Sequence, residues 1–307
     1  MLRIGSRGSK LALWQAQWVR SALERLGEDC EIEIIRTTGD NITDVSLARL
    51  GASTGVKGLF TKEIEEALLD GRIDLAVHSL KDMPVDLPDG LVLAAVPERE
   101  DARDVLVGST LARLPRNAKV GTSSLRRAAQ LRACRPDLVI EPLRGNIDTR
   151  LRKLDEGQYA GIVLAAAGLK RMGWEGRIAE PLPPEVMCPA VGQGALAIET
   201  RADEGRARQA CRKLEHAQTR AAVTAERALL RSLGGGCQVP IGGHAVVEGG
   251  RVHLRAVVIS PDGRQIVRRA NSGAVAEAEH VGAELGRDIL DAGARAILEV
   301  VYGTSGL

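Results

Sequence analysis

Lys81 and Asp82 are the first charged pair whose position suggests chemistry. They follow an apolar run that ends at His78 and reads as a buried strand, and Pro84 closes the segment. Open α/β sheets bind their ligands at the carboxyl ends of strands, so the pair is a candidate for a charged site. A solvated ion pair in a turn before proline is an equally good interpretation of the same spacing.

A second candidate is a segment of small hydroxyl residues followed by two arginines. Thr122 and Ser124 precede a predicted helix, and Arg126 and Arg127 lie in its first turn. Free backbone N–H groups, hydroxyls and guanidinium groups together favour an anion. Because basic side chains at a helix N-terminus oppose the helix dipole, an ordinary surface helix is the weaker explanation.

The basic character continues along the next predicted helix. Arg144 precedes the start of this helix, and Arg150 lies inside it. Nucleic acid is one candidate partner for such a patch, and a small polycarboxylate is the other. The chain has only three Trp, two Tyr and one Phe, and it lacks a helix-turn-helix or zinc pattern. The polycarboxylate is therefore favoured, because single-stranded nucleic acid is usually bound on aromatic side chains.

Cys237 follows three glycines, which is the most unusual local feature of the sequence. Glycines 234–236 free the backbone, so the thiol is expected on a mobile tether. A buried structural cysteine in a loop is the common alternative. The five histidines have no spacing that indicates a cysteine-protease partner. Gly192-Gln193-Gly194 lacks the third glycine of a dinucleotide fingerprint and is a weak signal for NAD.

Composition narrows the class of protein that carries these residues. The 307 residues are 44% hydrophobic and 27% charged, with a net charge of +2, which is typical of a folded globular protein. No apolar run approaches the roughly 18 residues of a membrane span, and the N-terminus does not read as a secretory signal. Five widely separated cysteines form no CxxC pair. We therefore expect a cytoplasmic protein without a membrane partner, a disulfide framework or a metal.

Alternating strands and helices are expected to position the candidate residues. The first hundred residues read as a parallel α/β unit, and the pattern restarts after the charged segment 98–101. The expected strands of the second unit are residues 104–108, 118–121, 138–141 and 160–164. A strand from Ala195 to Thr200 is expected to return to the first sheet. Two α/β domains with double crossovers would then enclose a cleft.

A different order of elements from Ala217 predicts a separate α+β domain. A long helix to Leu233, a hairpin around residues 261–263 and a last helix from Val275 to Val300 indicate three strands and two helices. The expected fold class is thus α/β, with two α/β domains and a C-terminal α+β domain that holds a three-stranded sheet. The expected domains are residues 1–97 with 195–212, residues 100–190, and residues 217–307.

Several segments taken together resemble the porphobilinogen deaminase family, also called the hydroxymethylbilane synthases. In chain order the matching segments are residues 4–9, 11–16, 57–60, 78–84, 121–127, 143–150, 192–194 and 235–240. A single match of this length can arise by chance, but the ordered set covers nearly the whole chain and is highly specific.

The resemblance implies a fold, a reaction and a cofactor. The first two domains are expected to resemble type II periplasmic binding proteins, and the third carries the cofactor. Four porphobilinogen molecules are joined head to tail, with release of four ammonia, into the hydroxymethylbilane used for haem and related tetrapyrroles. The product grows on a dipyrromethane cofactor, which is two condensed porphobilinogen units held by a thioether to Cys237.

The resemblance also assigns roles to single residues. Asp82 matches the catalytic aspartate of the family. The positions that bind carboxylates of the cofactor or substrate are matched by Arg7, Ser9, Lys57, Lys81, Arg99, Thr122, Ser124, Arg126, Arg127, Arg144, Arg150, Arg171 and Gln193. Two departures from the family pattern are expected. Relatives often have Glu or Asn at the position of Gly234, and the loop 47–56 is longer than in some relatives and holds Arg49 in place of a family lysine. They put in doubt the kinetics of domain closure and not the reaction class.

The chemistry of porphobilinogen explains these residue types independently. Each added ring brings an acetate and a propionate, so the growing chain suits a cleft of arginines and helix N-termini. A fixed carboxylate such as Asp82 stabilises the positive charge that develops when ammonia leaves. The chemistry needs no metal.

A non-catalytic solute-binding or ligand-sensing protein is the rival from another class, because two α/β lobes with an anion cleft serve that role too. The near-neutral net charge and the absence of a heptad seam predict a monomer.

Overall fold

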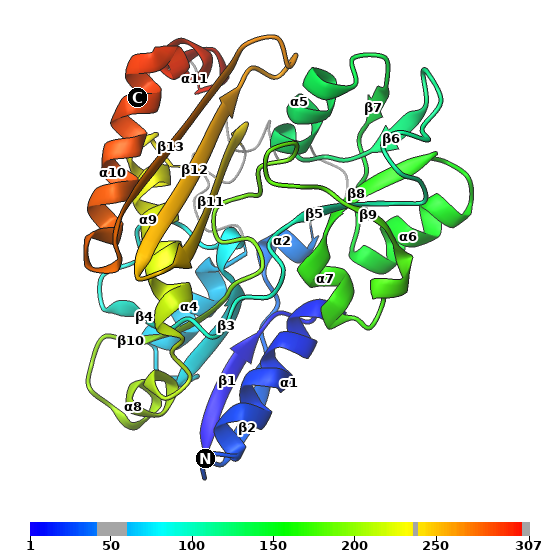
Figure 1. Cartoon of the computed structure of the whole chain (residues 1–307). Helices are drawn as coiled ribbons and strands as arrows, with labels where there is room; N and C mark the ends of the chain where they lie inside the picture. The colour runs from blue at the N-terminus through cyan, green and yellow to red at the C-terminus, as the bar shows by residue number, and fades with distance from the viewer. Residues whose placement is uncertain (42–59, 236–238, 303–307) are drawn as a thin grey trace. The chain divides into compact units, whose positions relative to one another are not determined.

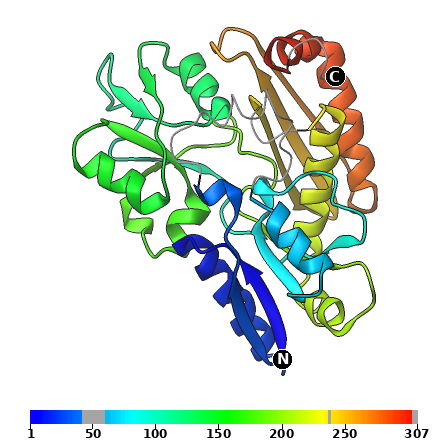
Figure 2. The same cartoon turned by 180° about the vertical axis from the view of Figure 1, so that it is seen from behind.

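The computed structural model describes residues 1–41, 60–235 and 239–302, and the chain divides into two compact units (Figures 1 and 2). Unit 1 comprises residues 1–100 and 195–220. Unit 2 comprises residues 101–194 and the chain from residue 221 onward. The division into three domains with the expected boundaries stays a prediction.

Unit 1 is built on a five-stranded mixed sheet in the order β2-β1-β3-β10-β4. Its strands are β1 (Leu2–Ser6), β2 (Cys30–Ile34), β3 (Leu75–Ser79), β4 (Leu91–Ala95) and β10 (Leu196–Arg201). β1 pairs in parallel with β2 and β3, whereas β10 runs antiparallel to β3 and β4. The expected return of the chain to the first sheet is confirmed by β10.

Helices cover both faces of this sheet. α1 (Lys10–Glu24) and α8 (Arg206–Arg212) share one apolar core with β1 and β3, and α4 (Lys62–Leu69) packs on the opposite face. A short helix, α2 (Thr38–Asn41), follows β2. The amphipathic pattern that predicted α1 is confirmed, because Ala16, Val19 and Leu23 are all buried in that core.

The first sheet of unit 2 repeats the arrangement with the order β7-β6-β8-β5-β9. Its strands are β5 (Asp104–Val107), β6 (Lys119–Gly121), β7 (Val139–Glu141), β8 (Gly161–Ala165) and β9 (Ile178–Pro181). β6 is parallel to β7 and β8, and β5 is antiparallel to β8 and β9. α5 (Leu125–Cys134) packs on one face, and α6 (Ile147–Asp155) and α7 (Ala166–Arg171) pack on the other.

The second sheet of unit 2 is antiparallel, in the order β11-β12-β13, and helices line one of its faces (Figure 1). The strands are β11 (Ile241–Glu248), β12 (Arg251–Ile259) and β13 (Ile266–Ala274), and the helices are α9 (Ala217–Ser232), α10 (Ala278–Ile289) and α11 (Arg295–Tyr302). The predicted fold class is confirmed, with two mixed five-stranded α/β sheets and a C-terminal three-stranded sheet with helices.

The prediction of one uninterrupted helix from Val275 to Val300 is wrong. Gly293 has φ +103°, a conformation that ends regular helix geometry, and the chain makes a wide turn over Leu290–Ala294 before α11. A single glycine is tolerated inside many helices, so the sequence pattern does not reveal the break.

Candidate functional site

Lys81 and Asp82 lie in a short 3₁₀ turn, Leu80–Asp82, directly after β3. β3 is buried along most of its length, and Leu80 and Met83 are buried on either side of the two charged residues. The N–H of Leu80 donates to the carbonyl of Ala195, and the N–H of Met83 donates to the carbonyl of Leu80. The apolar anchors therefore hold the turn, with Lys81 half-buried and the Asp82 carboxylate exposed.

The end of β3 is fixed from both faces of the sheet. On one face, Nε2 of His78 lies 3.1 Å from Oε2 of Glu199, a fully buried carboxylate on β10. On the other face, the Ser79 hydroxyl bonds the amide of Gln15 on α1, with an Nε2···Oγ distance of 2.9 Å. Sequence reasoning missed Glu199 and Gln15, because neither lies near the turn in the chain.

Arg7 and Ser9 lie in the loop between β1 and α1. Ser9 is the N-cap of α1, and its hydroxyl accepts the N–H of Ala12 at 3.3 Å. The Arg7 guanidinium carbon lies 4.2 Å from the ring centroid of Phe60, a cation–π contact that holds a half-buried charge in place. Arg99 is half-buried, and its backbone N–H donates to the hydroxyl of Thr219.

Ser124 is the N-cap of α5, as its type predicts, and Thr122 holds Ser124 in place. The Ser124 hydroxyl accepts the N–H of Arg127 at 3.4 Å, and the Thr122 hydroxyl accepts the N–H of Ser124 at 3.2 Å. Arg126 and Arg127 lie in that first turn, and their side chains are 5% and 8% exposed. The two guanidinium groups thus lie inside unit 2, although the sequence gives no sign that they are buried.

The two arginines converge on Asp104, the first residue of β5. Nη1 of Arg126 donates to Oδ2 of Asp104 at 2.6 Å, while Nε and Nη2 of Arg127 donate to Oδ1 at 2.9 and 2.7 Å. Nε2 of Gln193 donates to the same oxygen at 2.9 Å. Burial alone would raise the pKa of Asp104, but the two guanidinium charges and these hydrogen bonds hold it well below its usual range.

Arg144 and Arg150 flank the start of α6, where both are half-buried. Nε of Arg150 donates to the carbonyl of Gly145 at 2.7 Å. Gly145 has φ +108°, and a Cβ built there would lie 2.7 Å from Cγ2 of Thr149. Only glycine fits this turn, which turns the carbonyl toward Arg150.

Arg171 ends α7 and is 8% exposed, and its Nη2 donates to the carbonyl of Gly194 at 2.6 Å. Unit 2 thus holds Thr122, Ser124, Arg126, Arg127, Arg144, Arg150, Arg171 and Gln193, and unit 1 holds Arg7, Ser9, Lys81, Asp82 and Arg99. Lys57, Cys237, Arg49 and the loop 47–56 lie outside the described residues.

The four described cysteines are poor nucleophiles. Cys30, Cys188 and Cys211 are buried and Cys134 is exposed, and none of the four forms a disulfide. Burial raises the pKa of both Cys188 and Cys211 to about 12, and it also raises the pKa of Cys30 and Cys134. None of these four thiols is therefore activated as a thiolate.

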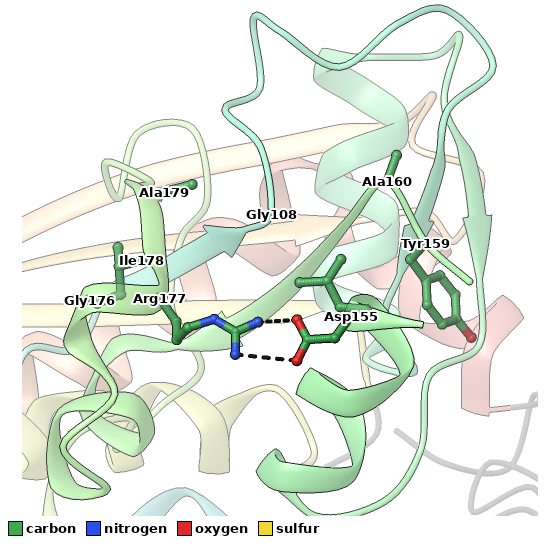
Figure 3. Close-up of a pocket in the computed structure, with 9 residues that line it drawn as sticks. Gly108, Asp155, Tyr159, Ala160, Gly176, Arg177, Ile178 and Ala179 are labelled. Atoms are coloured by element: carbon green, nitrogen blue, oxygen red, sulfur yellow. Dashed lines mark hydrogen bonds and ion pairs between the residues drawn. The ribbon is translucent and has the colours of Figure 1, made fainter. Parts of the chain in front are cut away.

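A hollow of about 470 Å³ lies on unit 2 beside the end of α6, where Asp155 and Arg177 face each other in an ion pair (Figure 3). None of the described site residues lines this hollow. Within the described ranges, no group of three or more His, Cys, Asp or Glu side chains could hold a metal ion, and no helix is long and apolar enough to cross a membrane.

The sequence of the chain is similar to two protein-family models and to curated relatives over nearly its whole length. Residues 2–209 match the model of the porphobilinogen deaminase dipyrromethane cofactor binding domain, and residues 220–291 match that of the porphobilinogen deaminase C-terminal domain. The chain is 52% identical to the porphobilinogen deaminase of Syntrophobacter fumaroxidans, with 98% of each chain covered. It is also 52% identical to that of Moorella thermoacetica, over 99% of this chain and 98% of the relative.

The chain belongs to the porphobilinogen deaminase family. The expected reaction class is confirmed: it is a transferase of tetrapyrrole biosynthesis that acts on porphobilinogen and carries a dipyrromethane cofactor. Solved structures similar to the chain include a periplasmic substrate-binding protein of an ABC transporter from Coxiella burnetii (15% identity, 70% of this chain and 92% of that chain, TM-score 0.43). The methionine-binding protein MetQ is also similar (14% identity, 69% and 89% covered, TM-score 0.41).

Proposed function

We propose that the described arginines bind the carboxylates of the dipyrromethane cofactor and of the growing chain. The main support for this proposal is the hydrogen bonding of Arg126. This residue is buried, yet only its Nη1 donates hydrogen bonds to described residues. Its Nε and Nη2 groups make no hydrogen bond within the described part of the chain. A guanidinium that is fixed through one nitrogen, beside a helix N-terminus capped by a hydroxyl, offers hydrogen-bond donors that suit a polycarboxylate.

The remaining predicted residues extend this donor set. Thr122, Ser124, Arg144, Arg150, Arg171 and Gln193 in unit 2, and Arg7, Ser9, Lys57, Lys81 and Arg99 elsewhere in the chain, complete it in this proposal. When bound, the cofactor supplies a terminal pyrrole ring as the site at which the product chain is extended. The protein groups bind and orient carboxylates, and their positive charges compensate the anionic charge that accumulates with each ring.

Asp82 is the catalytic carboxylate in this proposal. It is exposed, whereas the turn that carries it is anchored by Leu80 and Met83 and by the fixed end of β3. A rigidly placed negative charge stabilises the positive charge that develops on the substrate when ammonia leaves its aminomethyl group. Asp82→Asn should therefore slow porphobilinogen consumption about 100-fold, the usual cost of one preorganised electrostatic group. Near-normal consumption by this variant would contradict the assignment.

Cys237 is the attachment point of the cofactor in this proposal. The glycines before it support the assignment, because Gly234 and Gly235 have φ values of +85° and +58° that other residues rarely adopt. The high pKa values of Cys188 and Cys211 also disfavour those thiols as alternatives.

The decisive experiment is intact mass spectrometry of the denatured protein. The wild type should exceed its polypeptide mass by two porphobilinogens less two ammonias, and Cys237→Ser should show the polypeptide mass alone. Cys134→Ser, which removes the exposed member of the four described cysteines, is the matched control and should keep the adduct. An adduct that persists in Cys237→Ser, or that a peptide map places on another cysteine, would overturn the assignment.

The proposal includes a cytoplasmic monomer. A net charge of +2 and the lack of a heptad seam support the monomer, and four unpaired described cysteines are consistent with a reducing compartment. Light scattering after size-exclusion chromatography should give the mass of one chain, and a mass of two chains would contradict it.

A further inference from the structure

The single carboxylate of Asp104 pairs with two buried guanidinium groups. Its side chain is fully buried, and Arg126 and Arg127 both contact it, so the group carries a net positive charge inside unit 2. Two such charges without a counter-ion would be strongly disfavoured, because each would be buried and uncompensated. The geometry of the arginines therefore depends on the position of this one carboxylate.

The two arginines are held to very different extents. Arg127 donates from all three of its nitrogens: Nε and Nη2 to Asp104, Nη2 also to Gln193, and Nη1 to the carbonyl of Val163. Arg126 donates from Nη1 alone, to Asp104 and to the carbonyl of Cys188. Asp104 thus accepts hydrogen bonds from two nitrogens of the Arg127 guanidinium but from only one nitrogen of the Arg126 guanidinium.

The turn of residues 192–194 joins the third buried arginine to this group. Gln193 donates through Nε2 to Asp104 and to the carbonyl of Ala102, while the next carbonyl, that of Gly194, accepts Nη2 of Arg171. The N–H of Gly192 donates to Oε2 of Glu226, which is fully buried on α9. Gly192 and Gly194 have φ values of +71° and +87°, so the turn needs both glycines.

We propose that Asp104 is a positioning residue that sets the geometry of Arg126 for carboxylate binding and, through Gln193, that of the turn which holds Arg171. This inference rests on the proposed function, because it assigns carboxylate binding to Arg126 and Arg171. Asp104 is fully buried, and it acts through the arginines. Nothing in the local sequence of Asp104 distinguishes it from the other acids that start strands.

The test compares Asp104→Asn with Asp74→Asn in the purified full chain. Asp74 is a matched control, because it also pairs with two arginines, Arg3 at 3.1 Å and Arg201 at 3.5 Å, but it lies in unit 1 before β3. The measurements are the fraction of chains that carry the covalent adduct, the rate at which unloaded chains gain it at several porphobilinogen concentrations, and thermal unfolding.

At low porphobilinogen concentration, Asp104→Asn should gain the cofactor adduct about tenfold more slowly than the wild type, because its charge-assisted hydrogen bonds are misaligned. The rate is measured well below the unfolding temperature of the variant. The half-saturating porphobilinogen concentration should rise more than the maximal rate falls. Asp74→Asn should lose thermal stability but load like the wild type. Equal loading by Asp104→Asn and the wild type, or loading losses that simply follow thermal stability in both variants, would overturn the proposal.

Asp104→Glu keeps the test decisive if the asparagine variant fails to fold. It retains the charge but displaces the carboxylate by one methylene, so a positioning role predicts slower loading by folded protein. If Asp104→Glu gains the cofactor adduct at the wild-type rate, residue 104 only neutralises the charge of the two arginines, and the proposal is wrong. An unmodified wild type would refute the proposed function itself, whereas a loaded wild type with unaffected Asp104 variants would refute only this inference.

Discussion

Nε2 of His78 and Oε2 of Glu199 lie 3.1 Å apart, with only 5% of the His78 side chain and none of the Glu199 side chain exposed. The pair joins neighbouring strands β3 and β10 just before the turn that carries Asp82. The second oxygen of Glu199 has no hydrogen-bond partner among the described residues. His78 is therefore the main compensation for a buried carboxylate.

Replacing His78 should destabilise unit 1 strongly. His78→Leu leaves Glu199 uncompensated, and the free energy of unfolding should fall by about 3 kcal/mol, the usual result of removing one partner of a buried pair. The double variant with Glu199→Leu should recover much of that loss, because two apolar side chains need no compensation. Urea unfolding followed by circular dichroism measures both. Equal losses in the single and double variants would show that the pair itself contributes little.

Glu65 on α4 is another buried carboxylate, and it should make the stability of the protein depend on pH. Burial raises its pKa and the charge of Glu199 raises it further, although the nearby Thr61 hydroxyl opposes the shift. The folded protein therefore binds more protons than the unfolded chain between the ordinary and the raised pKa. Stability falls as pH rises through that window, and the loss remains above it.

Glu65→Gln removes the loss of stability that ionisation of the buried carboxylate causes. The variant should unfold at higher urea concentration than the wild type at neutral pH, and the difference should disappear below the ordinary pKa of glutamate. Glu66→Gln, at the exposed neighbouring position, is the matched control and should change stability by less than about 0.5 kcal/mol at either pH. A Glu65→Gln variant that is no more stable than the wild type at neutral pH would show that the carboxylate is adequately solvated.

Gly145 and Gly157 form a natural comparison within unit 2. Both have positive φ, but a Cβ at Gly145 would contact Thr149 at 2.7 Å, whereas one at Gly157 would meet nothing within 4 Å. Gly157→Ala should cost about 1 kcal/mol of stability through backbone strain alone. Gly145→Ala should cost more and should also slow cofactor loading, because the Gly145 carbonyl holds Arg150. Thermal unfolding and intact mass measure the two effects, and identical behaviour of the variants would contradict this role of Gly145.

Local sequence signals predicted the elements that begin the candidate site. The hydroxyl at Ser124 predicted a helix start and caps α5, and the apolar run before Lys81 is β3. The strand expected from Ala195 to Thr200, after a Pro- and Gly-rich stretch, is β10 of the first sheet. Each of these signals is carried by neighbours in the chain, which is why they can be recognised without a structure.

The partners of the site residues could not be predicted in the same way. Asp104 lies 22 residues from Arg126, and Glu199 lies 121 residues from His78. Such pairs depend on strand order, and nothing near either residue specifies it. Burial of Arg126 and Arg127 was equally hidden, because arginine in a first helical turn normally indicates a solvated or ligand-facing side chain. The break at Gly293 was missed because a single glycine is tolerated inside many helices.

The arginines themselves give the last prediction, in which the effect of a substitution depends on the stage of chain growth. Residues that hold the cofactor should be needed for its assembly, and residues met only by later rings should allow early additions and then stall. We assign Arg126, Arg127 and Arg144 to the first group and Arg171 to the second. Arg152→Leu is the control, because Arg152 is 65% exposed on α6 and pairs only with Glu156 among the described residues.

Each Arg→Leu variant, including Arg150→Leu, is given limiting porphobilinogen, and the covalent masses are read for one to four added rings. The first group should lack the cofactor adduct, and Arg171→Leu should accumulate an intermediate mass. Arg152→Leu should give the wild-type series, because an exposed charge contributes roughly 0 to 1 kcal/mol. If Arg126, Arg127, Arg144, Arg150 and Arg171 variants all show the wild-type series at a uniformly lower rate, the arginines do not grip successive carboxylates. The burial of Arg126, Arg127 and Arg171 around Asp104 and Gly194 would then serve the fold of unit 2 alone.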